Sequence, residues 1–82
     1  MSNLHDYIGK NRKWEQLWAD DQEAIWFERT DSKQYPYEVF RARPNMLFDD
    51  GVMIISQAFC ENITQAFEIW NGCINKHLEA TK

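Results

Sequence analysis

The side chains that could carry out chemistry in this 82-residue chain are few and widely spaced. The soft metal ligands are limited to two cysteines and two histidines: Cys60, Cys73, His5 and His77. Cys73 and His77 lie four residues apart, which places them on one face of a helix. Structural zinc sites usually contain close ligand pairs such as Cys-x2-Cys, and the sequence has none. We therefore expect no metal site, and we expect both cysteines to be reduced and structural.

The same pair, Cys73 and His77, has the residue types of a nucleophile and its general base. A carboxylate that could orient the histidine, such as Glu79, would point to a different face of the helix. No glycine-rich turn is present that could bind an oxyanion or a phosphate. The acidic residues 49, 50 and 61 could supply oxygen ligands for a hard metal, but two aspartates before a glycine are explained by turn formation. We therefore predict no enzyme activity and no cofactor.

The net charge of −4 argues against a protein that follows nucleic-acid phosphates, because nonspecific nucleic-acid affinity comes mainly from clustered Lys and Arg. The charge is unevenly distributed along the chain. In residues 20–31, the only basic residue is Arg29, and the acidic residues are Asp20, Asp21, Glu23, Glu28 and Asp31. Basic residues cluster before this stretch at Lys10, Arg12 and Lys13, and after it at Arg41 and Arg43. Regions of both signs favour a protein partner with a complementary potential.

The sequence contains no pattern typical of export or membrane insertion. Its first six residues lack the basic start and apolar run of a secretory signal, and Ser2 in place of Gly excludes N-myristoylation. The longest apolar run, Val52–Ile55, is far shorter than the roughly 20 residues of a membrane helix. We expect a cytoplasmic protein, acting in the host cytoplasm if a phage encodes it.

Two segments have helical periodicity. The apolar residues of 62–80 recur at helical spacing, and Asn62 with Gln65 resembles a capping arrangement, so a helix is predicted there. Phe67 and Trp70 are its expected anchors in the core, and Gly72 within it indicates close packing or simple tolerance. Residues 1–20 form a second candidate helix, with a short turn followed by a helix over 11–19 as the alternative.

Between these segments the apolar period changes to two residues, which is typical of strands. Strands are predicted at Glu23–Thr30, Tyr35–Arg43 and Val52–Phe59, with a short additional strand at Met46–Phe48 as an alternative. The resulting order is α-β-β-β-α over a single small domain, residues 1–82. We expect an α+β fold with a three-stranded antiparallel sheet, four-stranded if the extra strand forms, and two helices on one face.

This order resembles that of double-stranded RNA-binding domains. That family carries a lysine cluster at the start of its last helix, which grips phosphates across the groove. The corresponding residues here, 61–65, contain one glutamate and no basic residue. The resemblance is therefore one of layout, and it does not imply RNA binding.

The chain is rich in aromatic residues, with five Phe, three Tyr and four Trp. Each buries about 150–250 Å², more than so small a domain can hide, and we expect some to form a binding surface. We predict a non-enzymatic protein-binding module that blocks a basic surface of a partner enzyme. The class would be a small acidic inhibitor or decoy of the phage or mobile-element type, acting against host enzymes or defence systems, or an immunity protein. The predicted contact residues are Asp20, Asp21, Glu23, Asp31, Tyr35 and Tyr37.

Two alternatives remain open at this stage. An accessory or self-associating subunit of a larger complex would hide its aromatic residues in a homodimer through the outer sheet face, whereas an inhibitor would be a monomer. A single-stranded nucleic-acid binder would stack bases on Tyr35 and Tyr37 beside Arg41 and Arg43.

Overall fold

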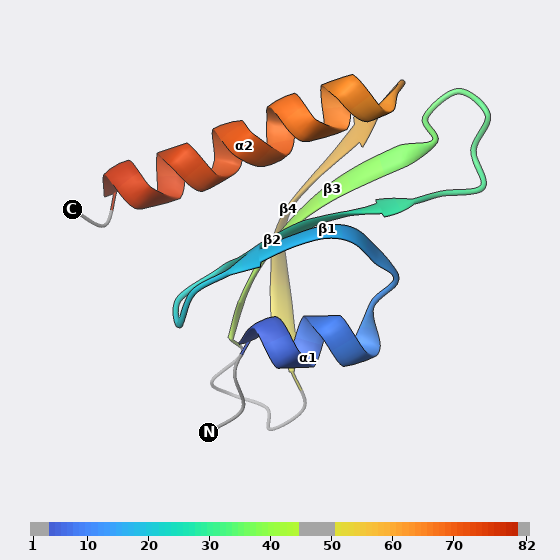
Figure 1. The fold of residues 1–82 in the computed structure, drawn as a ribbon. Helices are drawn as coiled ribbons and strands as arrows, with labels where there is room; N and C mark the ends of the chain where they lie inside the picture. Colours follow the sequence, from blue (N-terminus) through green and yellow to red (C-terminus); the bar gives the residue numbers. More distant parts are fainter. Residues whose placement is uncertain (1–3, 45–50, 81–82) are drawn as a thin grey trace.

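The computed structural model describes residues 4–44 and 51–80, which form two helices and four strands (Figure 1). In chain order these are α1 (Leu4–Asn11), β1 (Trp14–Ala19), β2 (Ala24–Arg29), β3 (Tyr37–Pro44), β4 (Val52–Cys60) and α2 (Ile63–Ala80). The strands form one antiparallel sheet in the order β1-β2-β3-β4, so β1 and β4 are its edges. The predicted α+β class is confirmed.

The fourth strand comes from the beginning of the chain. α1 ends at Asn11, and residues 14–19, predicted as helix, form β1 and pair with β2. A tight turn drives this pairing: the Asp20 amide donates to the Glu23 carbonyl (3.0 Å), and Asp20 Oδ1 accepts from the amides of Gln22 (2.9 Å) and Glu23 (2.8 Å). Helical and strand periods fit so short a segment equally well, and the hairpin decides between them. The alternative strand at 46–48 lies outside the described residues.

The two helices cover opposite faces of the sheet, which differs from the prediction that both share one face. Ala24 and Trp26 of β2 pack with Leu4 and Ile8 of α1, whereas Phe27 packs against α2. Alternate residues of a strand point to opposite faces, and Figure 1 shows the strands running between α2 above and α1 below. We call the two sides the α1 face and the α2 face. Because β2 carries large apolar side chains on both, each face requires its own cover.

The C-terminal helix has the predicted cap and anchors. Asn62 Oδ1 accepts a hydrogen bond from the Gln65 amide (2.8 Å), and Gln65 Oε1 accepts one from the Glu61 amide (2.7 Å). Phe67 and Trp70 both pack edge-on against the Phe27 ring, with centroids 5.0 and 6.3 Å away. The Trp70 indole also donates to the Ile25 carbonyl (2.9 Å), so α2 is fixed to β2 by apolar packing and by a hydrogen bond.

Gly72 is tolerated in α2 rather than required by packing. A Cβ at this position would meet no atom within 4 Å. Gly51, by contrast, has a φ of 144°, and a Cβ there would lie 2.5 Å from the Tyr7 hydroxyl oxygen. Positive φ and close approach both require glycine at the start of β4.

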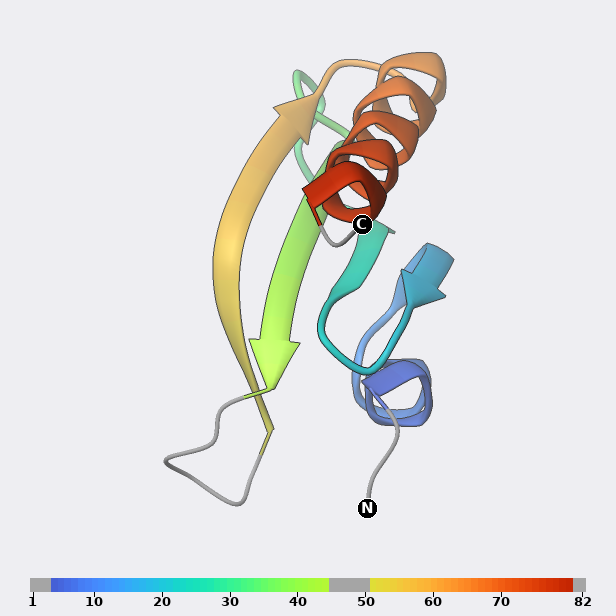
Figure 2. The ribbon, with the colours of Figure 1, turned by 90° about the vertical axis from the view of Figure 1, so that its left-hand side faces the viewer.

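β4 is a long, curved strand at the outer edge of the sheet (Figure 2). Its pairing with β3 shifts register between Arg41 and Ala42, which face Ser56 and Ile54 respectively, so Ile55 is an extra, bulged residue. Bulges bend a strand and increase its twist. Within the two described ranges, no helix is long and apolar enough to span a membrane.

Candidate functional site

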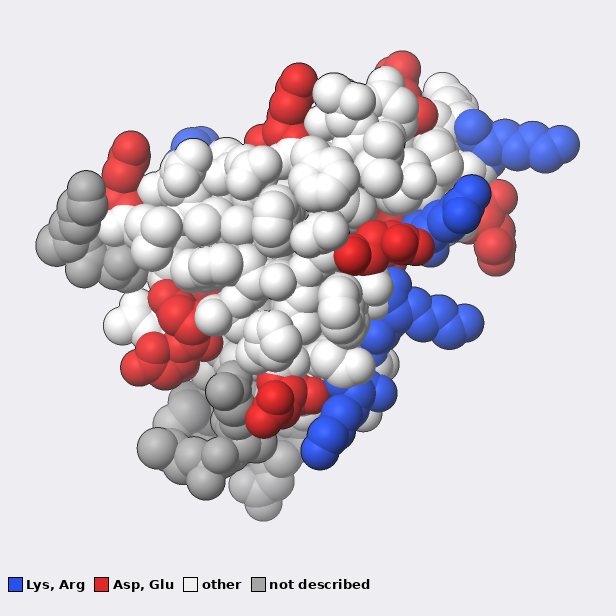
Figure 3. All heavy atoms as spheres, viewed as in Figure 1, with Lys and Arg blue, Asp and Glu red and all other residues white. Residues whose placement is uncertain are grey.

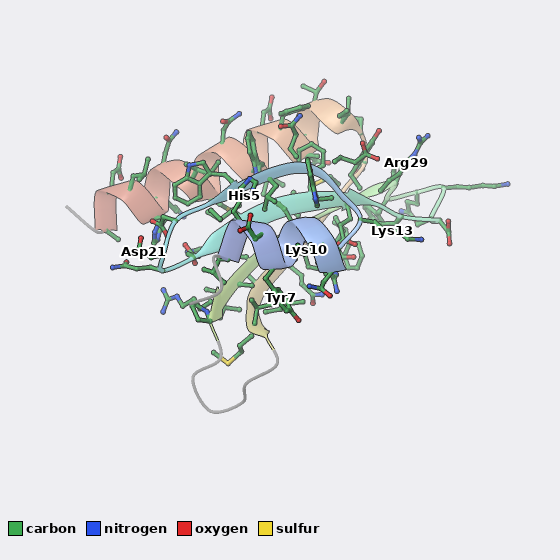
Figure 4. All side chains as sticks on the ribbon, turned by 60° about the horizontal axis from the view of Figure 1, so that its bottom comes forward. His5, Tyr7, Lys10, Lys13, Asp21 and Arg29 are labelled. Atoms are coloured by element: carbon green, nitrogen blue, oxygen red, sulfur yellow. The ribbon has the colours of Figure 1, made fainter. Side chains whose placement is uncertain are left out.

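The predicted contact residues lie at two ends of the sheet rather than in one surface. Asp20, Asp21 and Glu23 are in or beside the β1–β2 turn, whereas Asp31, Tyr35 and Tyr37 are in or beside the β2–β3 loop. β2 separates these ends; its six residues span roughly 20 Å at about 3.3 Å per residue. In Figure 4, Asp21 and Arg29 mark the two ends. The structure therefore does not bring the six residues together.

Glu23 belongs to the interior of the protein. Its side chain is 0% exposed, and Oε1 accepts a hydrogen bond from Arg41 Nη2 (2.9 Å). Arg43 Nε lies 3.8 Å from the same oxygen, and His77 Nδ1 lies 2.9 Å from Oε2. The approach of His77 is close enough for an ion pair, although Oε2 makes no well-directed hydrogen bond with the described residues. Burial removes Glu23 from any surface that a partner could touch.

His77 connects this carboxylate to a second one. Its Nε2 lies 2.7 Å from Asp20 Oδ2, and the Trp18 ring packs edge-on against the imidazole, with centroids 5.7 Å apart. Burial acts to raise the pKa of Asp20. Hydrogen bonds from the Gln22 amide, His77 and the Glu23 amide outweigh burial, so the pKa of Asp20 lies below its ordinary value.

Together these side chains form a network that we call the ionic cluster, which consists of Asp20, Glu23, Arg41, Arg43 and His77. The ionic cluster joins the β1–β2 turn and β3 to the last turns of α2, and it therefore helps to hold α2 onto the sheet. The sequence analysis did not predict this network. The one signal for it in the sequence is the position of His77 near the C-terminal end of a helix, where a cation is favoured.

The surroundings of Cys73 do not favour its thiolate form. Burial raises the pKa of its thiol, which is opposite to what an activated thiolate requires. The histidine four residues on is held between Asp20 and Glu23 instead. Across the described parts of the chain, no group of three or more His, Cys, Asp or Glu side chains is placed to hold a metal ion.

The charged side chains do not form a broad acidic surface on the side of the molecule seen in Figure 3. On the side of the molecule seen in Figure 3, acidic groups are spread around the rim and most basic groups lie on the right, while uncharged side chains fill the middle. Of the acidic residues in the β1–β2 turn, Asp21 is exposed and Asp20 is partly buried in the ionic cluster. The predicted electrostatic surface at this end is therefore smaller than the sequence indicates.

The remaining predicted residues occupy different faces. Tyr37 packs edge-on against Phe27 on the α2 face, with ring centroids 5.9 Å apart. Tyr35 instead lies against Phe59 of β4, with centroids also 5.9 Å apart. Of the two tyrosines, only Tyr35 adjoins the outer edge of the sheet, while Asp31 is exposed in the β2–β3 loop.

The largest exposed apolar feature is on β4. Four of its large side chains are at least 37% exposed, and we call them the β4 surface: Met53, Ile54, Ile55 and Phe59. The strand contains no Lys, Arg, Asp or Glu from Val52 to Cys60. Exposed edge strands are normally protected by charged side chains or proline, because their unpaired backbone groups invite another strand. Among the described residues, the bulge at Ile55 is the one such protection of β4. The uncharged run VMIISQAFC is the sequence signal for this surface.

Acidic and aromatic side chains extend from the β4 surface across the α1 face. Trp14, Glu28, Glu38 and Phe59 are cross-strand neighbours on β1 to β4. Arg12 Nε pairs with Glu28 Oε2 at 2.7 Å, and its guanidinium lies over the rings of Phe40 (5.0 Å) and Trp26 (5.7 Å). Glu38 makes no ion pair with any described residue. Burial, and then the neighbouring Glu28 carboxylate, raise the pKa of Glu38, while Arg12 acts in the opposite direction.

Comparisons with known proteins return no relative whose function could be transferred: no protein-family model matches the sequence, and no curated protein or solved structure matches it.

Proposed function

We propose that this chain is a non-enzymatic protein-binding module that engages its partner through the β4 surface. The observation that carries the proposal is an edge strand of nine residues with no charged side chain and four exposed large apolar ones. An exposed apolar cluster of this kind commonly marks an interaction site. A free strand edge adds main-chain hydrogen bonds to the apolar contact, as in recognition by strand addition.

The acidic character of the chain supports a partner with a basic surface. A net charge of −4 raises the rate of association with such a surface, even where the acidic side chains do not form a single patch. The role would be that of a small inhibitor or decoy of the phage or mobile-element type, or of an immunity protein, blocking a partner enzyme in the cytoplasm. Composition and the exposed β4 edge support this class.

One observation also favours self-association as a second candidate. Because β4 carries no charge, two copies could pair along this edge without placing like charges opposite each other. A symmetric dimer would then cover the β4 surface without a foreign partner. Sedimentation velocity over a wide range of concentrations separates the two, since the inhibitor predicts a monomer throughout.

Affinity capture with matched variants tests the proposal. The immobilised chain is compared with a variant carrying Ile54→Ser and Phe59→Ser on the β4 surface, and with the control Leu78→Ser. Leu78 is a 43% exposed apolar residue of α2, so the control removes similar apolar surface from another element. The proposal predicts that the double variant loses the captured protein and that Leu78→Ser retains it. Undiminished capture by a folded double variant would contradict it.

A further inference from the structure

We propose, resting on the function above, that the occupant of the β4 edge is an extended segment of a partner protein that carries a Lys or Arg opposite Phe59. That cationic side chain lies across the Phe59 ring and pairs with the Glu38 carboxylate on the next strand. Phe59 and Glu38 would therefore define a specific recognition position at the β4 surface. This position would select a chemical feature of the partner that the exposed apolar residues alone do not define.

The molecule already contains a related arrangement one strand further in, where the carboxylate is diagonal to the ring rather than directly opposite it. On the α1 face, Arg12 lies over the Phe40 ring and pairs with Glu28 at 2.7 Å. Glu38 and Phe59 are the next glutamate and aromatic residue on the same face, directly opposite each other on β3 and β4. In the second pair, no described residue forms an ion pair with the carboxylate or places a cation over the ring. Arg12 acts on Glu38 only through its more distant charge.

The distances across the sheet allow an added strand to supply that cation. Neighbouring strands lie about 4.8 Å apart, so a residue added opposite Phe59 would be roughly 10 Å from Glu38, measured between backbones. Directly opposed residues share one face of the sheet. An extended Lys or Arg side chain, together with that of Glu38, spans such a gap while passing over the ring between them.

The environment of Glu38 makes a cation favourable there. Burial and the adjacent Glu28 both oppose its charge, as the raised pKa of Glu38 shows. A positive side chain that approaches from the partner would relieve this unfavourable charge and cover Phe59, which is 61% exposed. Tyr35, whose ring packs beside Phe59, completes the apolar side of the position.

Charge also distinguishes this occupant from a second copy of the chain. β4 contains no Lys or Arg, so a neighbouring copy pairing through its own β4 could not place a cation opposite Phe59. A partner segment with a basic residue satisfies Glu38, whereas self-pairing leaves it unchanged. Complementary charge therefore favours the foreign strand.

Three peptides test the inference, each matched in length to the nine residues of β4. All alternate Thr and Val, are acetylated and amidated, and differ only at the central position, which is Arg, Gln or Glu. Titrations into the 15N-labelled chain are followed at the β4 amides by NMR. We expect the Arg peptide to bind about tenfold more tightly than the Gln peptide, the combined effect of a surface cation–π contact and an exposed ion pair. The Glu peptide should bind most weakly.

Variants locate this preference at the proposed position. Glu38→Gln removes a charge that the fold disfavours, so the variant should remain folded and should lose most of the preference for Arg over Gln. Phe59→Leu should lose part of it. The matched control Glu61→Gln removes an exposed carboxylate immediately after β4 and should retain the full preference.

Three results would overturn the inference, and they separate it from the proposed function. Equal affinities of the Arg and Gln peptides at the β4 amides would refute the cation but leave strand addition intact. Unchanged β4 amides with all three peptides would contradict both proposals. Concentration-dependent changes at β4 without peptide would identify a second copy as the occupant instead.

Discussion

The ionic cluster and the β4 surface reverse the usual distribution of side chains between the inside and the outside of a protein. In the ionic cluster, the carboxylate of Glu23 is fully buried between Arg41 and His77. On β4, Phe59 and Met53 are more than half exposed. Buried charge is costly unless it is paired, and exposed apolar surface is costly unless it is later covered. The charges of the first region therefore find opposite charges within the chain, whereas the apolar side chains of the second have no cover among the described residues.

The largest expected effect comes from removing the central carboxylate of the ionic cluster. Glu23→Ala takes the carboxylate away from Arg41 and leaves His77 with Asp20 alone, which should lower the free energy of unfolding by about 3–5 kcal/mol. Urea denaturation measures the change. Asp21→Ala, an exposed position in the same turn, is the control and should stay within about 0.5 kcal/mol of the wild type. Similar stabilities for both variants would show that the cluster contributes little.

Acid should weaken the same region. The folded-state pKa of Asp20 lies below its ordinary value of 3.8, so Asp20 contributes stability above that value, and this contribution is lost as the pH falls through the lowered pKa. In the Asp20→Asn variant, the free energy of unfolding should therefore fall less steeply with decreasing pH in this acidic range than in the wild type. Asp21→Asn should follow the wild-type curve. If the free energy of unfolding of Asp20→Asn changed with pH in parallel with that of the wild type, Asp20 would not be responsible for the acid sensitivity.

A smaller effect is expected in the helix that the ionic cluster holds in place. Gly72→Ala adds a Cβ that meets nothing within 4 Å, and alanine favours a helix interior over glycine by up to about 1 kcal/mol. The variant should therefore be more stable in thermal or urea unfolding, in contrast to Glu23→Ala. Destabilisation would show that the surface of α2 near Gly72 is more constrained than its open surroundings indicate.

The smallest effect on stability should come from the β4 surface, despite the size of the side chain removed. Phe59→Thr deletes an aromatic ring that packs against Tyr35 and against no other ring of the described residues. The substitution keeps a residue that favours strands. We expect the free energy of unfolding, measured by urea denaturation, to change by less than about 1 kcal/mol. A loss comparable with that of Glu23→Ala would mean that Phe59 supports the fold rather than a partner.

The sequence predicts those parts of the molecule that local patterns determine. The capped α2, the strands β2 to β4 and the anchors Phe67 and Trp70 follow from period, turn residues and capping, and the structure confirms them. The segment 14–19 could not be assigned in this way, because six residues fit a helical or a strand period, and its pairing with β2 is a tertiary effect.

The site was harder to predict than the fold, because exposure and pairing depend on the whole structure. The acidic run 20–31 predicts a surface, yet Glu23 is buried by residues from β3 and α2 that are distant in sequence. Alternation along β2 places Trp26 and Phe27 on opposite faces, but it does not say that a separate helix covers each. The side chains of the β4 surface are exposed because β4 lies at the edge of the sheet. The order of strands along the chain does not determine which strand of a four-stranded sheet lies at the edge.

Hydrogen–deuterium exchange of the chain with its captured partner tests the central claim most directly. We expect the partner to protect the backbone amides of residues 53–59 on β4, while amides around the ionic cluster, whose charges are paired within the chain, exchange as in the free chain. Protection confined to the β1–β2 turn, or to residues 10–13 at and beyond the end of α1, with β4 exchanging as in the free chain, would contradict it.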